Sequence, residues 1–267
     1  MNQENTSKLD VPVMADIFAR GEKPEYLYWV GCAGAFDDRY RKVARAFTGI
    51  MNYLKVNYAV LGSEESCTGD PARRAGNEML FQMQALSNIE TFTRYEVKKI
   101  LTTCPHCYNI FKNEYPDLGG RYEVIHYTNF LKEMISSGSI TFKDDTYRNA
   151  MITYHDPCYL GRANGEYEPA RRIIDALSGG RVEMERNRSF ALCCGAGGAQ
   201  MFKEAEPGDK EIFIERTEEA LKTGAGVVAT SCPFCMVMMT DGLKYKNKEE
   251  EIFNLDIAEL VFRAMGL

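Results

Sequence analysis

The sequence lacks any long apolar run, and this absence argues against a membrane-spanning helix. No segment approaches the ~20 uninterrupted apolar residues that crossing a bilayer requires. The first residues, Met1 to Lys23, are polar and lack the apolar core of a signal peptide. We therefore expect a cytoplasmic protein with no direct membrane span. In that reducing compartment, cysteines serve as ligands or redox groups more often than as structural disulfides.

Three further features are missing, and each excludes a class of function. The net charge is −6 with scattered basic residues, so the chain offers no nucleic-acid surface. The string Gly224-Ala225-Gly226 precedes a predicted strand, whereas a dinucleotide fingerprint must follow a strand and open a helix. The Cys-x-x-Cys-x-x-Cys-x-x-x-Cys-Pro run of ferredoxins is also absent. An oxidoreductase of this sequence would have to receive its electrons from another polypeptide.

What the sequence does contain is nine cysteines that form two matching sets. The matched residues are separated by 126 to 128 positions: Cys32 and Cys158, Cys67 and Cys194, Cys104 and Cys232, and Cys107 and Cys235. The surrounding residues repeat as well, since Thr-Thr-Cys-Pro-His-Cys parallels Thr-Ser-Cys-Pro-Phe-Cys. The repeat predicts two homologous units, 25–140 and 148–267, with a linker within 138–148.

Each half alternates short apolar runs with helical stretches. This order predicts an α/β fold in which crossover helices connect the strands of parallel sheets. The expected strands lie at 25–30, 58–61, 99–102 and 124–126 in the first half, and at 150–154, 182–184, 227–230 and 253–255 in the second.

Asp70 and Pro71 predict the start of one long helix, because aspartate caps helices well and proline suits the first helical position. An apolar stripe should bury this helix; its members are Met79, Met83, Leu86 and Ile89.

Every cysteine group follows a predicted strand or lies in a loop that leads to a helix. In parallel α/β sheets, ligand sites gather beyond the carboxyl ends of the strands, so the groups of one half should meet there. Both Cys-Pro-x-Cys motifs also open a helix, with Pro105 and Pro233 in its first turn. The free N–H groups and the dipole of a helix N-terminus stabilise thiolates.

The two halves offer different numbers of thiols. A zinc ion or a cubane cluster needs four ligands, and the second half has five: Cys158, Cys193, Cys194, Cys232 and Cys235. Adjacent cysteines can serve neighbouring irons of a larger cluster, and Gly195 and Gly197 allow the backbone to approach it closely. The first half has four, Cys32, Cys67, Cys104 and Cys107, and Ser66 stands where the repeat would place the partner of Cys193.

Other interpretations remain open from the residues alone. Cys-Pro-His-Cys after a strand could be a thiol–disulfide oxidoreductase site. The two Cys-Pro-x-Cys motifs could instead form a structural Cys₄ zinc site in an interaction protein, although five cysteines would then have no role. His155 lies three residues before Cys158 and could hydrogen-bond to cluster sulfur, relay a proton or be structural.

The spaced cysteines resemble those of a known family. The segments that carry the resemblance are Tyr28 to Cys32, Cys67 to Arg74, His155 to Arg162, Cys193 to Gly198 and the two Cys-Pro-x-Cys motifs. They are similar to the cysteine-rich (CCG) domains of the heterodisulfide reductase catalytic subunit and of related Fe–S oxidoreductases. The resemblance covers nearly the whole chain after residue 25.

The resemblance implies Rossmann-like domains that hold iron–sulfur clusters in a multi-subunit complex. A complete CCG motif carries a noncubane [4Fe-4S] cluster on five cysteines, which the second half matches. The first half departs from the motif at Ser66, so an ordinary cubane [4Fe-4S] cluster is expected there. The implied activity is electron transfer or oxidoreduction in a heterodisulfide-reductase-like complex. The implied partners are a ferredoxin-type or flavoprotein donor subunit and a membrane quinone-linked subunit, which would hold the protein at the inner membrane.

Overall fold

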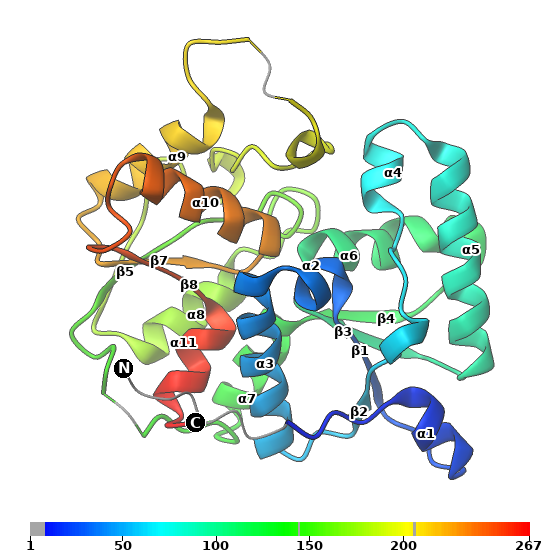
Figure 1. Cartoon of the computed structure of the whole chain (residues 1–267). Coiled ribbons are helices and arrows are strands. Elements are labelled where there is room, and N and C mark those ends of the chain that lie inside the picture. Colours follow the sequence, from blue (N-terminus) through cyan, green and yellow to red (C-terminus); the bar gives the residue numbers. More distant parts are fainter. Residues whose placement is uncertain (1–8, 144, 205–206) are drawn as a thin grey trace.

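The first half of the chain forms a four-stranded parallel sheet. A computed structural model describes residues 9–143, 145–204 and 207–267 (Figure 1). The strands of this sheet are β1 (Tyr26–Trp29), β2 (Tyr58–Ala59), β3 (Lys99–Thr102) and β4 (Glu123–His126). Their order is β2-β1-β3-β4, and every neighbouring pair is parallel. Residues before β1 also join this unit, since Val13 forms a parallel bridge to Val60.

The second half repeats this topology. Its strands are β5 (Met151–Tyr154), β6 (Gly180–Val182), β7 (Val227–Thr230) and β8 (Phe253–Asp256), in the order β6-β5-β7-β8. The neighbouring pairs are again parallel. Because the two strand orders are equivalent, the predicted α/β fold with internal duplication is confirmed.

Helices connect the strands in both units. In the first unit they are α1 (Met14–Ala19), α2 (Gly31–Phe36), α3 (Asp38–Tyr53), α4 (Asp70–Arg74), α5 (Glu78–Arg94), α6 (Pro105–Asn109) and α7 (Tyr127–Ser136). In the second they are α8 (Glu168–Leu177), α9 (Ile212–Lys222), α10 (Pro233–Tyr245) and α11 (Ile257–Ala264). A π-helical turn, Ile110–Glu114, continues α6, whereas its counterpart α10 is regular.

The long helix predicted from Asp70 is wrong in two respects. The chain forms the short α4 and then breaks, because Gly76 has a φ of +85° and the Asn77 side chain caps α5 by accepting from the Leu80 N–H. Three of the four residues of the predicted apolar stripe also face outward, with Met79 74%, Met83 61% and Leu86 51% exposed, and only Ile89 packs against the core. The buried face of α5 is a different one, made of Phe81, Ala85, Asn88 and Phe92.

The two units pack together through equivalent helices. Helix α3, which lies between the first two strands of the first unit, packs against α11, the last helix of the second unit (Figure 1). In the same way α8, between the first two strands of the second unit, packs against α7, the last helix of the first unit. This reciprocal pairing of helices is the pattern that a pseudo-twofold axis between the two units produces. One hydrophobic core runs across it and includes Tyr28 and Leu101 from one sheet with Ile152 and Ala229 from the other.

Candidate metal centres

The four cysteines of the first unit line a single pocket. Cys32 lies in the first turn of α2 just after β1, and Cys104 and Cys107 flank the start of α6 just after β3. Cys67 comes from the loop before α4, and all four line the same pocket together with Trp29 and His106. Cys104 and Cys107 are buried, Cys67 is partly buried and Cys32 is exposed. The pocket therefore reaches the surface beside Cys32.

Crowding in this pocket disfavours several thiolates at once. Burial and the neighbouring Cys104 and Cys67 raise the pKa of Cys32 to about 11. A hydrogen bond with Cys104, together with burial, raises the pKa of Cys107 well above its usual value. A bound cation reverses this preference, because it attracts every thiolate of the group. Four converging soft donors fit a metal centre better than four independent thiols.

The five cysteines of the second unit form a continuous chain of sulfur contacts. Cys158 follows β5, and Cys193 and Cys194 lie in the loop after the 3₁₀ turn Arg188–Phe190. Side-chain hydrogen bonds link Cys158 to Cys193, Cys193 to Cys194, Cys194 to Cys235 and Cys235 to Cys232. The bonds from Cys158 and Cys194 lower the pKa of Cys193, so this thiol is the acceptor of the group. The structure thus brings together all five predicted thiols.

The same backbone feature supports one cysteine in each unit. The N–H of Gly69 donates to Cys67 Sγ at 3.4 Å, and the N–H of Gly195 donates to Cys193 Sγ at 3.3 Å. The two glycines have φ values of +90° and +94°, in the left-handed region that glycine adopts readily. Gly197 differs, because it has ordinary φ and a side chain there would meet open space.

This match corrects the alignment of the two repeats. Cys67 corresponds to Cys193, and Thr68 rather than Ser66 occupies the place of Cys194. Thr68 and Cys194 are both 3% exposed, and each side chain hydrogen-bonds to the preceding cysteine.

Ser66 also lines the pocket of the first cysteine group, but its side chain bonds to a helix. Its hydroxyl donates to Asn88 Oδ1 at 2.9 Å, on the side of α5. The prediction that Ser66 occupies the place of the fifth cysteine is wrong. The offset between the repeats drifts from 126 to 128, so it cannot decide which of two neighbouring residues matches a given cysteine. The glycine that follows Thr68 and Cys194 is the signal in the sequence that could have found the correct match.

His155 lies against the second group of cysteines. One of its ring nitrogens, Cys194 Sγ and Cys235 Sγ all lie within 4.8 Å of one another. Arg216 Nε donates to His155 Nδ1 at 3.0 Å, and Arg216 Nη1 bonds to Glu219 at 2.9 Å. Burial and the Arg216 cation lower the pKa of His155 to about 3, so the imidazole is neutral.

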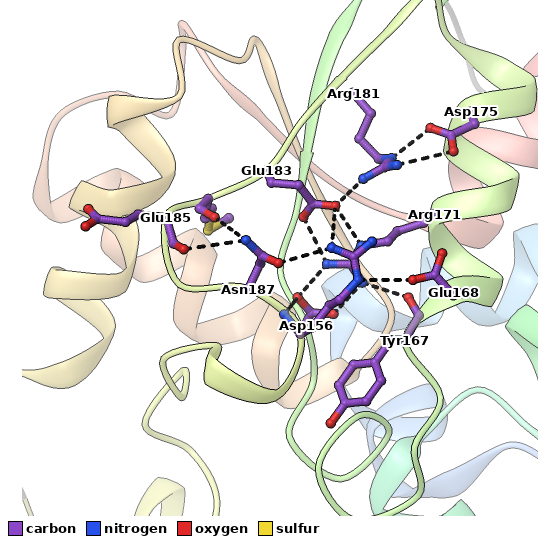
Figure 2. Close-up of polar contacts among 11 residues, drawn as sticks. Asp156, Tyr167, Glu168, Arg171, Asp175, Arg181, Glu183, Glu185 and Asn187 are labelled. Atoms are coloured by element: carbon purple, nitrogen blue, oxygen red, sulfur yellow. Dashed lines mark hydrogen bonds and ion pairs between the residues drawn. The ribbon is translucent and has the colours of Figure 1, made fainter.

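A buried ion-pair network holds the segment that carries Cys158 (Figure 2). Arg171 of α8 has no exposed surface and forms two bonds to Asp156, at 2.7 and 2.8 Å. It also forms two bonds to Glu183, at 2.8 and 2.9 Å. Asp156 Oδ2 accepts the Arg188 N–H at 2.8 Å as well. The network therefore joins three segments around the loop from β5 to Cys158.

The two cysteine groups face each other across the pseudo-twofold axis. The middle residues of the two Cys-Pro-x-Cys motifs, His106 and Phe234, are in edge-to-face contact with ring centroids 4.9 Å apart. His106 Nδ1 bonds to Asp70 Oδ2 at 2.8 Å, and the ring also hydrogen-bonds to Cys232 of the other unit. Burial alone would raise the pKa of Cys232, but bonds from Cys235 and His106 lower it to about 5. No pattern in the sequence indicates this bridge.

Comparison with known protein families agrees with the duplication. A family model described as the cysteine-rich domain (CCG) matches the chain twice, over residues 26–112 and 152–240. Each match contains all the cysteines of one unit.

Three similar proteins illustrate the relatives of the chain. It is 42% identical over 257 residues to a probable iron–sulfur-binding oxidoreductase of Bacillus subtilis, covering 96% of this chain and 36% of that protein. It is 42% identical over 251 residues to the EtfAB:quinone oxidoreductase of Syntrophomonas wolfei, covering 92% and 35%. One subunit of the dihydromethanophenazine:CoB–CoM heterodisulfide reductase of Methanosarcina barkeri is 34% identical over 257 residues, covering 92% and 60%. The chain thus spans about a third of the two bacterial relatives.

Proposed function

This chain belongs to the cysteine-rich domain (CCG) family, and from that membership we propose that it is an iron–sulfur electron-transfer unit of a heterodisulfide-reductase-like oxidoreductase. The observation that carries the proposal is the convergence of all nine cysteines into two groups, one in each unit. Its relatives bear names of iron–sulfur and quinone oxidoreductases and of a heterodisulfide reductase component.

The number of thiols suggests a different cluster in each unit. Cys32, Cys67, Cys104 and Cys107 would hold a cubane [4Fe-4S] cluster, which needs four thiolates. The five thiols of the second unit would hold a noncubane [4Fe-4S] cluster, with Gly195 supplying a backbone N–H to Cys193. Such clusters supply electron exchange, and the five-thiol site is the better candidate for two-electron chemistry at sulfur. Gly197 would leave room beside that site.

The alternative functions explain less of the arrangement. A structural zinc site built from both Cys-Pro-x-Cys motifs leaves five cysteines without a role, yet these five lie in the same two groups as the motifs. A thiol–disulfide oxidoreductase needs an accessible attacking thiol. The cysteines of both Cys-Pro-x-Cys motifs are buried.

The proposed partners supply an electron donor and a membrane link. Within residues 9–143, 145–204 and 207–267, no helix is long and apolar enough to cross a bilayer. We assign electron delivery to a ferredoxin-type or flavoprotein subunit and any quinone link to a membrane partner. The quinone oxidoreductase name of one relative supports that link. Such a complex would keep the protein on the cytoplasmic face of the membrane.

Iron analysis of anaerobically purified protein tests the proposal. We expect a brown protein with about eight irons per chain, four for each cluster. Cys194→Ala should lose about half of the iron, because Cys194 lies between Cys193 and Cys235 in the second group. A colourless protein that contains zinc, or full iron retention in Cys194→Ala, would contradict the proposal.

The corrected alignment gives a sharper test of the two cluster types. Thr68→Cys should supply the fifth thiol of the first unit and convert its EPR and Mössbauer spectra to the noncubane type. Cys194→Thr should convert the second unit to the cubane type. Ser66→Cys is the matched control, because it adds a thiol to the same pocket at the position whose side chain bonds to Asn88, and it should leave the first spectrum unchanged. Identical cluster types in both units of the unmodified protein would refute this division.

A further inference from the structure

Each unit places a nitrogen-bearing ring three residues before its first cysteine. Trp29 ends β1 and precedes Cys32, and His155 follows β5 and precedes Cys158. The sheet register makes them equivalent: Trp29 pairs with Thr102 of β3, and Tyr154 pairs with Ala229 of β7, which sets His155 beside Thr230. Both rings are fully buried.

The indole N–H of Trp29 has no hydrogen-bond partner in the part of the chain that the structure describes. Trp29 lines the pocket of the first cysteine group. A Cβ atom added to Gly31 would lie 3.9 Å from Trp29 Nε1 and 3.7 Å from Cys107 Sγ. The indole nitrogen and this sulfur are therefore on the same side of Gly31. Edge-to-face contacts with Phe92 and Phe111 fix the ring in this orientation. An indole nitrogen can only donate, so an acceptor is missing.

The contact with Arg216 fixes the tautomer of His155. A guanidinium has donors and no acceptor, so Arg216 Nε must donate to His155 Nδ1. The neutral ring then carries its proton on Nε2. This N–H also has no partner among the described residues, and a ring nitrogen lies within 4.8 Å of Cys194 and Cys235. A protonated Nε2 cannot bind iron, so His155 is a donor beside the site and not a ligand.

A buried donor without an acceptor costs roughly 1–3 kcal/mol, so two such donors at equivalent positions call for an explanation. Both face a cysteine group that fits an iron–sulfur cluster. We propose that Trp29 Nε1–H and His155 Nε2–H each donate a hydrogen bond to a sulfur of the cluster held in their unit, and that this bond raises its reduction potential. The inference rests on the proposed function of the two sites. Hydrogen bonds to sulfur are a recognised determinant of cluster potentials, because they stabilise the more negative, reduced state.

Conservative substitutions test the first donor. Trp29→Phe removes the N–H and keeps an aromatic ring, and it should make reduction of the first site about tenfold less favourable, about 59 mV for one electron. Tyr28→Phe is the matched control, because it removes a buried hydroxyl from the neighbouring residue, whose side chain packs in the hydrophobic core that the two units share. EPR-monitored redox titration gives the potentials. Unchanged potentials in Trp29→Phe at full iron content would overturn the inference.

At His155, one variant can remove the hydrogen-bond donor and a second can restore it. His155→Leu removes the donor and should shift the potential of the second site in the same negative direction. His155→Gln can accept from Arg216 and still donate, so it should restore most of the original potential. Tyr154→Phe is the control from the adjacent position. Equal potentials in the leucine and glutamine variants would contradict the assignment of the Nε2–H.

One measurement needs no variant that could disturb the cluster. The chain has a single tryptophan, so ¹⁵N-indole labelling reports on Trp29 alone. Pulsed EPR of the reduced protein should detect a coupling from this ¹⁵N to the first cluster. An iron-loaded protein without that coupling refutes the Trp29 assignment. A protein without iron refutes the proposed function itself, so the two failures are distinguishable.

Discussion

The buried ion pair between Arg171 and Asp156 supports the Cys158 segment. The Arg171 guanidinium is completely buried and neutralises Asp156, which is also buried. Arg171→Met would leave that carboxylate without its cation, and removing one partner of a buried ion pair costs about 3–5 kcal/mol. We expect the free energy of unfolding to fall by this amount in urea titrations, and the iron of the second site to fall with it.

Two further variants separate the charge effect from packing. Arg171→Met combined with Asp156→Leu removes the isolated charge and should recover part of the lost stability. Arg45→Met changes an exposed arginine of α3, the corresponding helix of the first unit, and should alter stability by no more than about 0.5 kcal/mol. Equal losses in Arg171→Met and Arg45→Met would refute a role for the buried ion pair.

Asp256 should make the stability of the protein depend on pH. Burial raises the pKa of its carboxyl group to about 8, against about 3.9 in an unfolded chain. Between these values the folded state holds a proton that the unfolded state has released, so this group's contribution to the free energy of unfolding falls as pH rises. Asp256→Asn keeps an oxygen that can accept from Tyr127 and the Ala258 N–H.

The free energy of unfolding of Asp256→Asn should therefore increase relative to that of the unmodified protein as pH rises. We expect little difference in the free energy of unfolding near pH 4, and an advantage of several kcal/mol for Asp256→Asn at pH 8. Contributions from other titrating groups cancel in this comparison. A difference that stays constant from pH 4 to pH 8 would show that Asp256 does not titrate in this range.

Individual residues differ in how far the sequence could predict them. The cysteines could be grouped because each group follows a strand or lies in a loop that leads to a helix, and parallel strands end at the same edge of a sheet. Thr68 was missed because its role depends on the left-handed turn at Gly69, which a repeat offset does not reveal. The bridge from His106 to Cys232 joins residues of different units, so it depends on how the units pack. No local pattern encodes that packing.

At the scale of elements, α5 shows why periodicity alone can choose the wrong face. Met79, Met83 and Leu86 repeat at helical spacing, yet Phe81, Ala85 and Phe92 repeat at that spacing as well. The second set is buried because Phe92 packs against Trp29 and Phe111 in the core of the first unit. The strands were predicted more accurately, since 99–102 and 227–230 match β3 and β7, although the strand predicted at 182–184 lies at Gly180–Val182. A strand that is buried on both faces can be predicted without deciding which face is buried.

Substitutions on the two faces of α5 should differ sharply in their effect. Phe92→Ala removes a fully buried ring and should lower the free energy of unfolding by about 3–5 kcal/mol. Met79→Gln and Met83→Gln change exposed side chains and should each stay within about 0.5 kcal/mol. Urea titrations of the three variants provide the comparison. A loss of several kcal/mol in Met83→Gln would mean that this methionine is covered in solution.

At the scale of the whole molecule, the duplication places two sites on either side of one axis. Equivalent helices from the two units form the interface between them. Polar contacts also cross it, from Tyr127 to Asp256 and from Arg39 to Glu259. The same packing brings His106 of one unit to Cys232 of the other. Since one core is shared, we interpret the two units as a single folding and functional body.

A close approach of two helices in this interface provides the last prediction. A side chain on Gly49 of α3 would begin only 2.5 Å from Phe262 Cε2 of α11, so the two helices meet without room for another carbon. Gly49→Leu should push them apart and lower the free energy of unfolding by about 1–3 kcal/mol, the usual range for overpacking. Combining it with Phe262→Ala frees space at the contact and should be less destabilising than the two single changes added together. Additive effects in this cycle, measured by urea unfolding, would show that the units do not meet at this contact.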